Sequence, residues 1–367
     1  MPVPGSRADE IAFAAMLFLF EGKMRTLFSI LFGASLLLFV QKADERGEDG
    51  AILQFRRLCW LTLFGYLHFA LFWWGDILFL YAISGLVALL LARLNTRVML
   101  ALALLGFTAW QANAIVRDLP LAQIEFREIT GAPIAAADAA KLAEVRERQY
   151  SDTRKEIARY ERGFLTQASY NLANNTFYPV AGVAYSFGET LPLMLIGMIL
   201  LRVGFFTGGW TKARLRRFSL VTLGFGSAMT AVFVAWAFTH HFPIQVMRLA
   251  INSALSVPHL LMALGYAGLL VLATPRIGAT ALGQRIVATG RMALSNYLGT
   301  TVLMTAIFYG WGFGLMGQIS TSWQIPFVLF GWSAMLWWSK PWLTRFGQGP
   351  LEWAWRKLTE MRRPDSN

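Results

Sequence analysis

Residues 58–74, LCWLTLFGYLHFALFWW, followed by Gly75-Asp76 and by residues 77–94, ILFLYAISGLVALLLARL, decide the fold of this chain. The two apolar runs contain 17 and 18 residues. A helix rises about 1.5 Å per residue, so runs of roughly this length can cross most of a ~30 Å hydrocarbon core. The stretch therefore predicts two antiparallel membrane helices joined by an almost loop-free turn.

Similar apolar runs recur along the whole chain, and they predict an all-α fold: a polytopic integral membrane helical bundle of roughly nine spans. The run at 26–40 is short for a span, so we expect its helix to begin near Gly22 and residues 11–20 to form an interfacial or re-entrant piece. The remaining predicted spans are 98–115, 186–201, 218–238, 258–274, 292–310 and 325–338.

The composition excludes several other classes of protein. Hydrophobic residues make up 56% of the chain and charged residues 15%, whereas soluble domains carry about 25% charge. Cys59 is the single cysteine, so no internal disulfide can form, and we expect no metal site. The net charge is +12, and the basic residues that produce it lie at the ends of apolar runs. This placement indicates lipid head groups of the bilayer as partners, and not nucleic acid.

Lysine and arginine gather in alternate short loops, which predicts the orientation in the membrane. The asymmetry requires an odd number of spans with a cytoplasmic C-terminus, so the N-terminus of this chain is expected on the extracytoplasmic side. The predicted organisation is N-terminal membrane helices (1–115), an extracytoplasmic helical insertion (116–185), a five-span membrane region (186–345) and a cytoplasmic tail (346–367). No signal peptide precedes residue 11, so we expect either signal-independent insertion or a missing upstream span.

Five stretches resemble the YeiB-like family of bacterial inner-membrane proteins, the domain of unknown function 418. They are 20–33 (FEGKMRTLFSILFG), 56–85 (with Arg56-Arg57, FGYLH at 64–68 and Gly75-Asp76), 193–197 (LMLIG), 290–297 (GRMALSNY) and 349–353 (GPLEW). The resemblance implies a location in the inner membrane and a distant similarity to transmembrane acyltransferases. Those enzymes move an acyl group from a cytoplasmic thioester, with acyl-coenzyme A as the implied donor, to an extracytoplasmic acceptor. The family usually begins with a further span carrying an Asp-x-x-Arg-Gly-like segment that this sequence lacks, so we expect a truncated chain or a misassigned start.

Ionisable groups at membrane depth are costly, so they are the first candidates for chemistry. His68 is a candidate general base, and Asp76, about 12 Å further along the axis, would orient it or bind the acceptor. The alternatives are a hydrogen-bonded core imidazole and a carboxylate that caps the next helix. Glu189, Lys23 and Arg25 are candidate substrate-binding groups on the same side, with helix-end electrostatics and ion pairing as their alternatives.

On the predicted cytoplasmic side, Arg291, Asn296 and Arg202 are candidates for holding the phosphates of a donor. The orientation signal alone explains arginines there, whereas Asn296 would tie helices together or line a cavity. The histidines at 240, 241 and 259 are interpreted as interfacial. The acyltransferase hypothesis predicts a cavity that runs from Arg291 and Asn296 to His68. A small-solute transporter and a non-catalytic membrane scaffold are the alternatives.

Overall fold

The computed structural model describes residues 5–360, and every regular element in that range is helical. The helices are α1 (Arg7–Leu19), α2 (Lys23–Glu45), α3 (Gly50–Leu71), α4 (Leu78–Leu91), α5 (Thr96–Ile129), α6 (Ala136–Tyr160), α7 (Phe164–Asn174), α8 (Tyr178–Arg202), α9 (Lys212–Thr239), α10 (Ile244–Leu249), the π-helix η1 (Ala250–Ala254), α11 (Ser256–Ile277), α12 (Ala281–Arg291), α13 (Ala293–Phe308), the short 3-10 helix η2 (Ser322–Gln324), α14 (Ile325–Phe346) and α15 (Pro350–Glu360). The predicted all-α class is confirmed.

Each predicted span coincides largely with one helix, and the interfacial piece at 11–20 lies in α1. Five segments are long and apolar enough to cross a membrane: Arg7–Glu45, Thr96–Ile129, Tyr178–Arg202, Lys212–Thr239 and Ser256–Ile277. The helices Leu78–Leu91 and Ala293–Phe308 are apolar but shorter. A membrane helical bundle therefore fits the structure, while the number of nine crossings stays a prediction.

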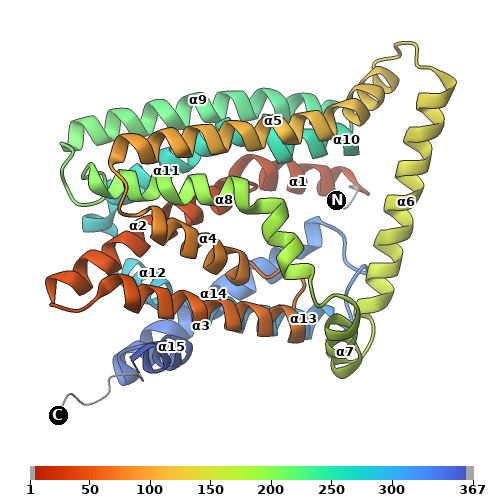
Figure 1. The fold of residues 1–367 in the computed structure, drawn as a ribbon. Helices are drawn as coiled ribbons and strands as arrows, with labels where there is room; N and C mark the ends of the chain where they lie inside the picture. The colour runs from red at the N-terminus through yellow and green to blue at the C-terminus, as the bar shows by residue number, and fades with distance from the viewer. Residues whose placement is uncertain (1–4, 361–367) are drawn as a thin grey trace.

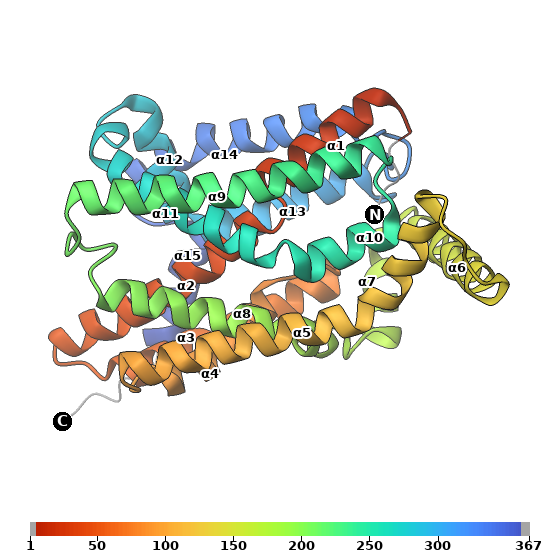
Figure 2. The ribbon, with the colours of Figure 1, turned by 90° about the horizontal axis from the view of Figure 1, so that it is seen from above.

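The connections between the helices lie at two opposite ends of the bundle (Figure 1). One end, here called the basic end, carries the connections at 46–49, 92–95, 203–211 and 347–349. The other, the insertion end, carries the α3–α4 turn together with α6 and α7; α6 lies outside the packed helices in Figure 2, whereas α7 packs on α3. Helix starts at the basic end are fixed by side-chain caps: Asp49, Asn95 and Thr211 each accept a hydrogen bond from the backbone N–H three residues later.

Glycine lets the central helices α2 and α8 touch backbone to backbone. A Cβ at Gly197 would lie 1.8 Å from the Ile30 carbonyl oxygen, and one at Gly33 would lie 2.0 Å from that of Met194. Small residues permit this approach, and dispersion between the two backbones stabilises it without any hydrophobic driving force. This contact positions Arg25 of α2 and Glu189 of α8 near each other.

The predicted insertion is held firmly against the bundle. Helix α5 continues through position 115 to Ile129, and α8 begins at Tyr178, so the predicted domain boundaries at 115 and 185 fall inside helices. Tyr160, at the end of α6, stacks on Tyr309 at a ring distance of 4.4 Å, and its carbonyl accepts from the Gly310 N–H at 2.8 Å. Burial raises the pKa of the Tyr160 phenol, so this stacked ring stays uncharged.

Helix α15, the described part of the predicted tail, docks on α3 and α13; residues 361–367 lie outside the described range. The Trp355 indole donates to the Arg57 carbonyl at 2.8 Å. The Glu352 carboxylate accepts from the backbone N–H groups of Leu294 (2.7 Å) and Ser295 (3.1 Å) at the start of α13. A carboxylate at a helix N-terminus satisfies otherwise orphaned donors and interacts favourably with the helix dipole.

Replacing Glu352 with alanine is expected to lower the free energy of unfolding by about 1–3 kcal/mol, because two partly buried N–H donors lose a charged acceptor. Glu360→Ala in the same helix is the control, since Glu360 forms an exposed ion pair with Arg356, and we expect a change within about 0.5 kcal/mol. Unfolding by SDS titration measures both. Equal effects of the two substitutions would contradict the anchoring function of Glu352.

Candidate active site

His68 and Asp76 form a buried ion-pair-like dyad at the turn between α3 and α4. The His68 Nδ1 lies 2.8 Å from the Asp76 Oδ1, and the two side chains are 0% and 2% exposed. The second carboxylate oxygen of Asp76 accepts from the Phe79 N–H at 2.8 Å, which is a helix-capping contact. Asp76 thus both caps α4 and holds His68, so the two roles considered from the sequence coexist in one side chain.

A glycine makes this geometry attainable. A Cβ at Gly65 would lie 2.3 Å from the Phe79 nitrogen and 2.8 Å from the Asp76 Oδ2, so any larger residue there would displace the turn. Helix α3 ends at Leu71 and α4 begins at Leu78, and the short connection between them places Asp76 against His68. Within FGYLH at 64–68, Gly65 therefore permits the close approach of α3 to the start of α4, and His68 provides the imidazole.

The remaining nitrogen of the imidazole is free. His68 Nε2 is buried and has no hydrogen-bond partner among the described residues. A carboxylate that accepts from Nδ1–H fixes the tautomer whose Nε2 lone pair is available, which is the arrangement of a general base. The Tyr297 ring of α13 lies 5.1 Å from the imidazole, and its hydroxyl oxygen accepts from the Ile77 N–H at 3.3 Å.

Two cavities flank the dyad along α13. The His68 cavity, of about 460 Å³, is lined mainly by apolar side chains and extends from His68 to Ser295, Leu351 and Trp338 near the basic end. Its lining residues on α13 run from Ser295 to Val302, a rise of about 10 Å along the helix. An apolar passage therefore connects the first turn of α15 with the imidazole.

The second, the Tyr297 cavity, has a volume of about 750 Å³ and opens toward the insertion end. Asn296 and Tyr297 line one part of it, and Trp73 and Trp74 of the α3–α4 turn line another. Threonine hydroxyls of α13 at 300, 301 and 305 add polar groups to its wall. The dyad and Tyr297 thus stand between a cavity that reaches the basic end and one that reaches the insertion end.

The candidate substrate-binding residues separate into two places. Arg25 and Glu189 form an ion pair, with a guanidinium nitrogen 3.1 Å from the Glu189 Oε2. The Tyr81 hydroxyl and the Ser29 hydroxyl lie 2.7 Å apart, and both donate to the Arg25 carbonyl. Arg25, Ser29, Tyr81 and Glu189 thus form one polar cluster between α2, α4 and α8.

Lys23 does not join that pair. It is 0% exposed, and its Nζ donates to the Leu17 carbonyl at 2.6 Å at the break between α1 and α2. A Cβ at Gly22 would lie 2.0 Å from the His259 Nδ1, so His259 packs directly on the break. The other two histidines are also engaged: His240 stacks on Trp236, and His241 contacts Glu10.

The candidate donor-binding residues do not form one site. Arg202 donates to the carbonyls of Leu94 and Ala92 at the end of α4, whereas Arg291 donates to the Gly347 carbonyl at the end of α14. Both arginines therefore satisfy helix C-termini. The buried Asn296 amide donates to the Thr289 carbonyl and the Ser339 hydroxyl, each at 3.0 Å, so it ties helices together as well as lining the Tyr297 cavity.

The structure instead gathers other arginines, which the sequence reasoning missed as a group, at the basic end. A cavity of about 1000 Å³ between α2, α3 and α15, here called the arginine cavity, is lined by Arg46, Arg56, Arg57 and Arg356. The Arg57 guanidinium lies between the rings of Phe39 and Trp355, at 4.1 and 4.3 Å. Glu352 lines this cavity and Leu351 lines the His68 cavity, so the two adjoin at the first turn of α15.

Comparison with known proteins places the chain in a family. The "Uncharacterized protein YeiB" of Escherichia coli K12 is 30% identical over 352 residues, covering 92% of this chain and 81% of the relative. The chain belongs to the YeiB-like DUF418 family. The family model, described as "Protein of unknown function (DUF418)", matches residues 200–362. No solved structure matches the chain.

Two further relatives are similar along nearly the whole length of this chain. The "Uncharacterized protein YxaH" of Bacillus subtilis 168 is 26% identical, covering 96% of this chain and 83% of the relative. The "Uncharacterized 39.9 kDa protein in amylase 3'region" of Bacillus acidopullulyticus is 28% identical, covering 98% and 86%. The stretches that carried the family resemblance meet at the site: 64–68 and 75–76 supply the dyad, 290–297 supplies Tyr297, and 349–353 supplies Glu352.

Proposed function

We propose that this DUF418 protein is a transmembrane acyltransferase of the bacterial inner membrane. The donor would be a thioester, acyl-coenzyme A, that enters from the cytoplasm at the basic end, and the small-molecule acceptor would enter from the extracytoplasmic side at the insertion end. The observation that supports this most is the buried His68–Asp76 dyad: His68 Nε2 has no hydrogen-bond partner among the described residues, and His68 lines the apolar cavity that extends toward the basic end.

The chemistry follows from the geometry of the dyad. His68 Nε2 removes the proton from an acceptor hydroxyl, and Asp76 stabilises the imidazolium through Nδ1–H. The acceptor oxygen attacks the thioester carbonyl, a new C–O bond forms, and the C–S bond breaks. The leaving thiolate takes the proton back from Nε2. Tyr297, whose ring lies against the imidazole, is a positioning residue in this scheme.

The arginine cavity and the adjoining His68 cavity suit the phosphate groups and the acyl chain of acyl-coenzyme A, respectively. Guanidinium groups form strong charge-assisted hydrogen bonds to phosphate, and four arginines line the arginine cavity, two of which, Arg46 and Arg356, pair with Glu48 and Glu360. Arg57 Nε is buried without a partner among the described residues, and it lies at this cavity. The adjoining His68 cavity is apolar and suits an acyl chain with its thioester carbonyl directed toward His68.

Solute transport is the second candidate, because Lys23 is a fully buried ionisable group at a break between two helices. Interrupted helices and buried charges near the membrane interior are typical of transporter sites. His259, packed on Gly22 beside Lys23, would belong to such a site.

One assay separates the two functions. Proteoliposomes of the full chain hold acetyl-coenzyme A with a labelled acetyl group inside, and an extract of bacterial envelope lipids and glycans outside. Acyl transfer predicts covalent label in the external extract with the wild type, and loss of that label with His68→Gln. His240→Gln is the matched control, since the hydrogen bonds of the His240 ring within the described range go to Trp236 and Thr239, away from the dyad. Label that crosses without forming a covalent product would support transport and reject the acyltransferase.

A further inference from the structure

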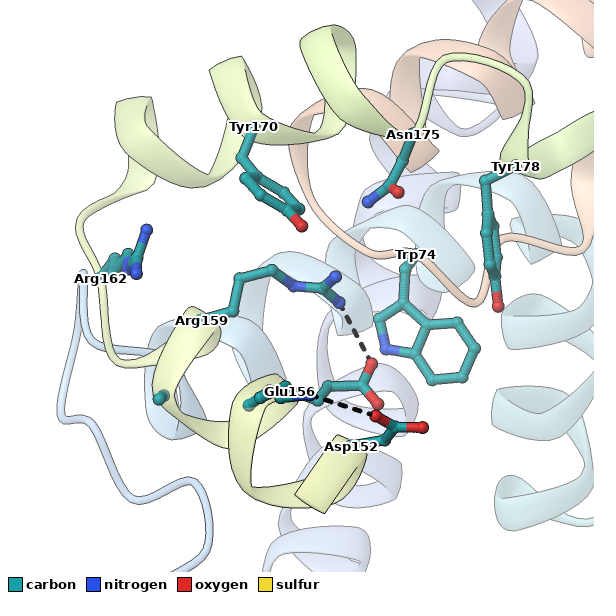
Figure 3. Close-up of a pocket in the computed structure, with 10 residues that line it drawn as sticks. Trp74, Asp152, Glu156, Arg159, Arg162, Tyr170, Asn175 and Tyr178 are labelled. Atoms are coloured by element: carbon teal, nitrogen blue, oxygen red, sulfur yellow. Dashed lines mark hydrogen bonds and ion pairs between the residues drawn. The ribbon is translucent and has the colours of Figure 1, made fainter. Parts of the chain in front are cut away.

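A cavity at the insertion end lies outside the dyad and its two flanking cavities. It has a volume of about 560 Å³ and is formed by α6, by the segment joining α7 to α8, and by the α3–α4 turn (Figure 3). We call it the insertion cavity. None of the residues that carry the proposed chemistry lines it, so it is available for a separate binding function.

Three aromatic side chains face the insertion cavity. Trp74 comes from the α3–α4 turn, Tyr170 from α7, and Tyr178 from the start of α8. They are 37%, 37% and 44% exposed, which leaves much of their ring surface uncovered. Large aromatic rings clustered around one hollow are a preferred surface for the apolar face of a ligand.

Four of the five charged groups that line the cavity are already paired with each other. Glu156 and Arg159 form an ion pair at 3.1 Å, and Asp152 and Lys155 form one at 3.7 Å. Arg162 lies at the edge of the view, away from Trp74 (Figure 3). A cationic ligand would meet Lys155 and Arg159, and an anionic ligand would meet both carboxylates, so neither sign of charge is favoured.

The paired groups and one amide nevertheless offer many directed hydrogen bonds. Each carboxylate keeps acceptor capacity beyond its ion pair, and the Arg159 guanidinium carries five N–H donors. The Asn175 side-chain amide supplies both a donor and an acceptor, and it makes no hydrogen bond to another residue in the described range 5–360. The cavity thus combines aromatic surface with alternating donors and acceptors and little net charge.

We propose that the insertion cavity binds an uncharged, polyhydroxylated ring, a carbohydrate, as the acceptor of the reaction. Such a ring presents C–H faces to Trp74 and the tyrosines and hydroxyl groups to Glu156, Arg159 and Asn175. This inference rests on the proposed acyl transfer and names the chemical class of its acceptor.

The insertion cavity adjoins the Tyr297 cavity. Trp74 lines both the insertion cavity and the Tyr297 cavity, so one indole separates the two. A second link runs through α6: Arg159 donates to the Tyr160 hydroxyl at 2.7 Å, Tyr160 stacks on Tyr309, and Tyr309 lines the Tyr297 cavity. Tyr297 lines that second cavity, and its ring lies 5.1 Å from the His68 imidazole, so Trp74 and Tyr297 lie between the insertion cavity and the dyad.

Saturation-transfer NMR on the full chain in lipid nanodiscs tests the proposal without any acyl donor. The probes are the methyl glycosides of glucose, galactose and mannose, compared with glucosamine as a cation and glucuronate as an anion. We expect at least one uncharged glycoside to bind more tightly than both charged sugars. Trp74→Ala and Asn175→Ala should each weaken that binding about tenfold or more.

Two variants keep the result interpretable. Trp74→Phe retains an aromatic face and should bind within about threefold of the wild type, which separates loss of the ring from loss of the fold. Glu147→Gln is the matched control, because Glu147 forms an exposed ion pair with Arg154 on the same helix but outside the cavity. It should leave binding unchanged.

The proposal is overturned if no uncharged glycoside binds, if a charged sugar binds more tightly, or if Trp74→Ala leaves binding unchanged. Binding should persist in His68→Gln, since the dyad does not line the insertion cavity. Loss of glycoside binding together with intact His68-dependent acyl transfer rejects the carbohydrate alone. Glycoside binding without any acyl transfer rejects the proposed reaction and leaves a carbohydrate site.

Discussion

Asp76→Asn is expected to lower the rate of acyl transfer by about 10²–10⁴-fold while leaving the fold intact. The asparagine carbonyl can still accept from the Phe79 N–H and cap α4. Its amide, however, donates to the imidazole, so His68 Nδ1 becomes the acceptor and Nε2 carries the proton. The base would then hold the wrong tautomer, and no carboxylate would stabilise the imidazolium.

The controls for this prediction use the same assay in proteoliposomes. Asp9→Asn replaces another buried carboxylate that accepts from a backbone N–H, that of Ser322 at 2.7 Å, but among the described residues Asp9 makes no hydrogen bond to a histidine. It should transfer at the wild-type rate. The double variant His68→Gln/Asp76→Asn should be no slower than His68→Gln alone, since the two residues act as one unit. Additive losses would show that Asp76 acts independently of His68.

Gly197→Val is expected to destabilise the protein by about 3 kcal/mol or more, the largest effect on stability predicted here. The new Cβ would lie 1.8 Å from the Ile30 carbonyl oxygen, which belongs to helix backbone and cannot turn aside as a side chain can. Helices α2 and α8 would have to separate, and the packing around Met194 and Leu193 would be lost with them. SDS titration of the free energy of unfolding measures this effect.

Gly224→Val in α9 is the matched control, because a Cβ at Gly224 meets no atom within 4 Å. The same substitution in a helix of similar length should change the free energy of unfolding by less than about 1 kcal/mol, through helix propensity alone. Similar losses at both positions would mean that Gly197 does not hold a close helix contact.

The helices themselves followed from local features of the sequence. The length and apolarity of 58–74 and 77–94 predicted α3 and α4, and the loop-free Gly75-Asp76 connection required Asp76 to remain beside the bundle. The ends of helices that continue into polar sequence were harder to predict. The apolar pattern ends near residue 115, but helix α5 continues to Ile129, because helical backbone hydrogen bonds do not require apolar side chains. The site hypothesis for the dyad, Glu189, Lys23 and Arg25 remains a prediction, with Lys23 lying apart from the ion pair.

What only the tertiary structure decided is which helices bring their polar groups together. Tyr297 meets the α3–α4 turn across 220 positions of sequence at the Ile77 N–H, and α15 encloses Arg57 between Phe39 and Trp355. Such contacts depend on helix packing, and apolar periodicity does not encode which faces will meet. The sequence by itself determined a membrane helical bundle with a histidine and an aspartate at one turn. Their neighbours and the cavities were decided by how α3, α13 and α15 pack, because each of those surfaces is built from side chains that are distant along the chain.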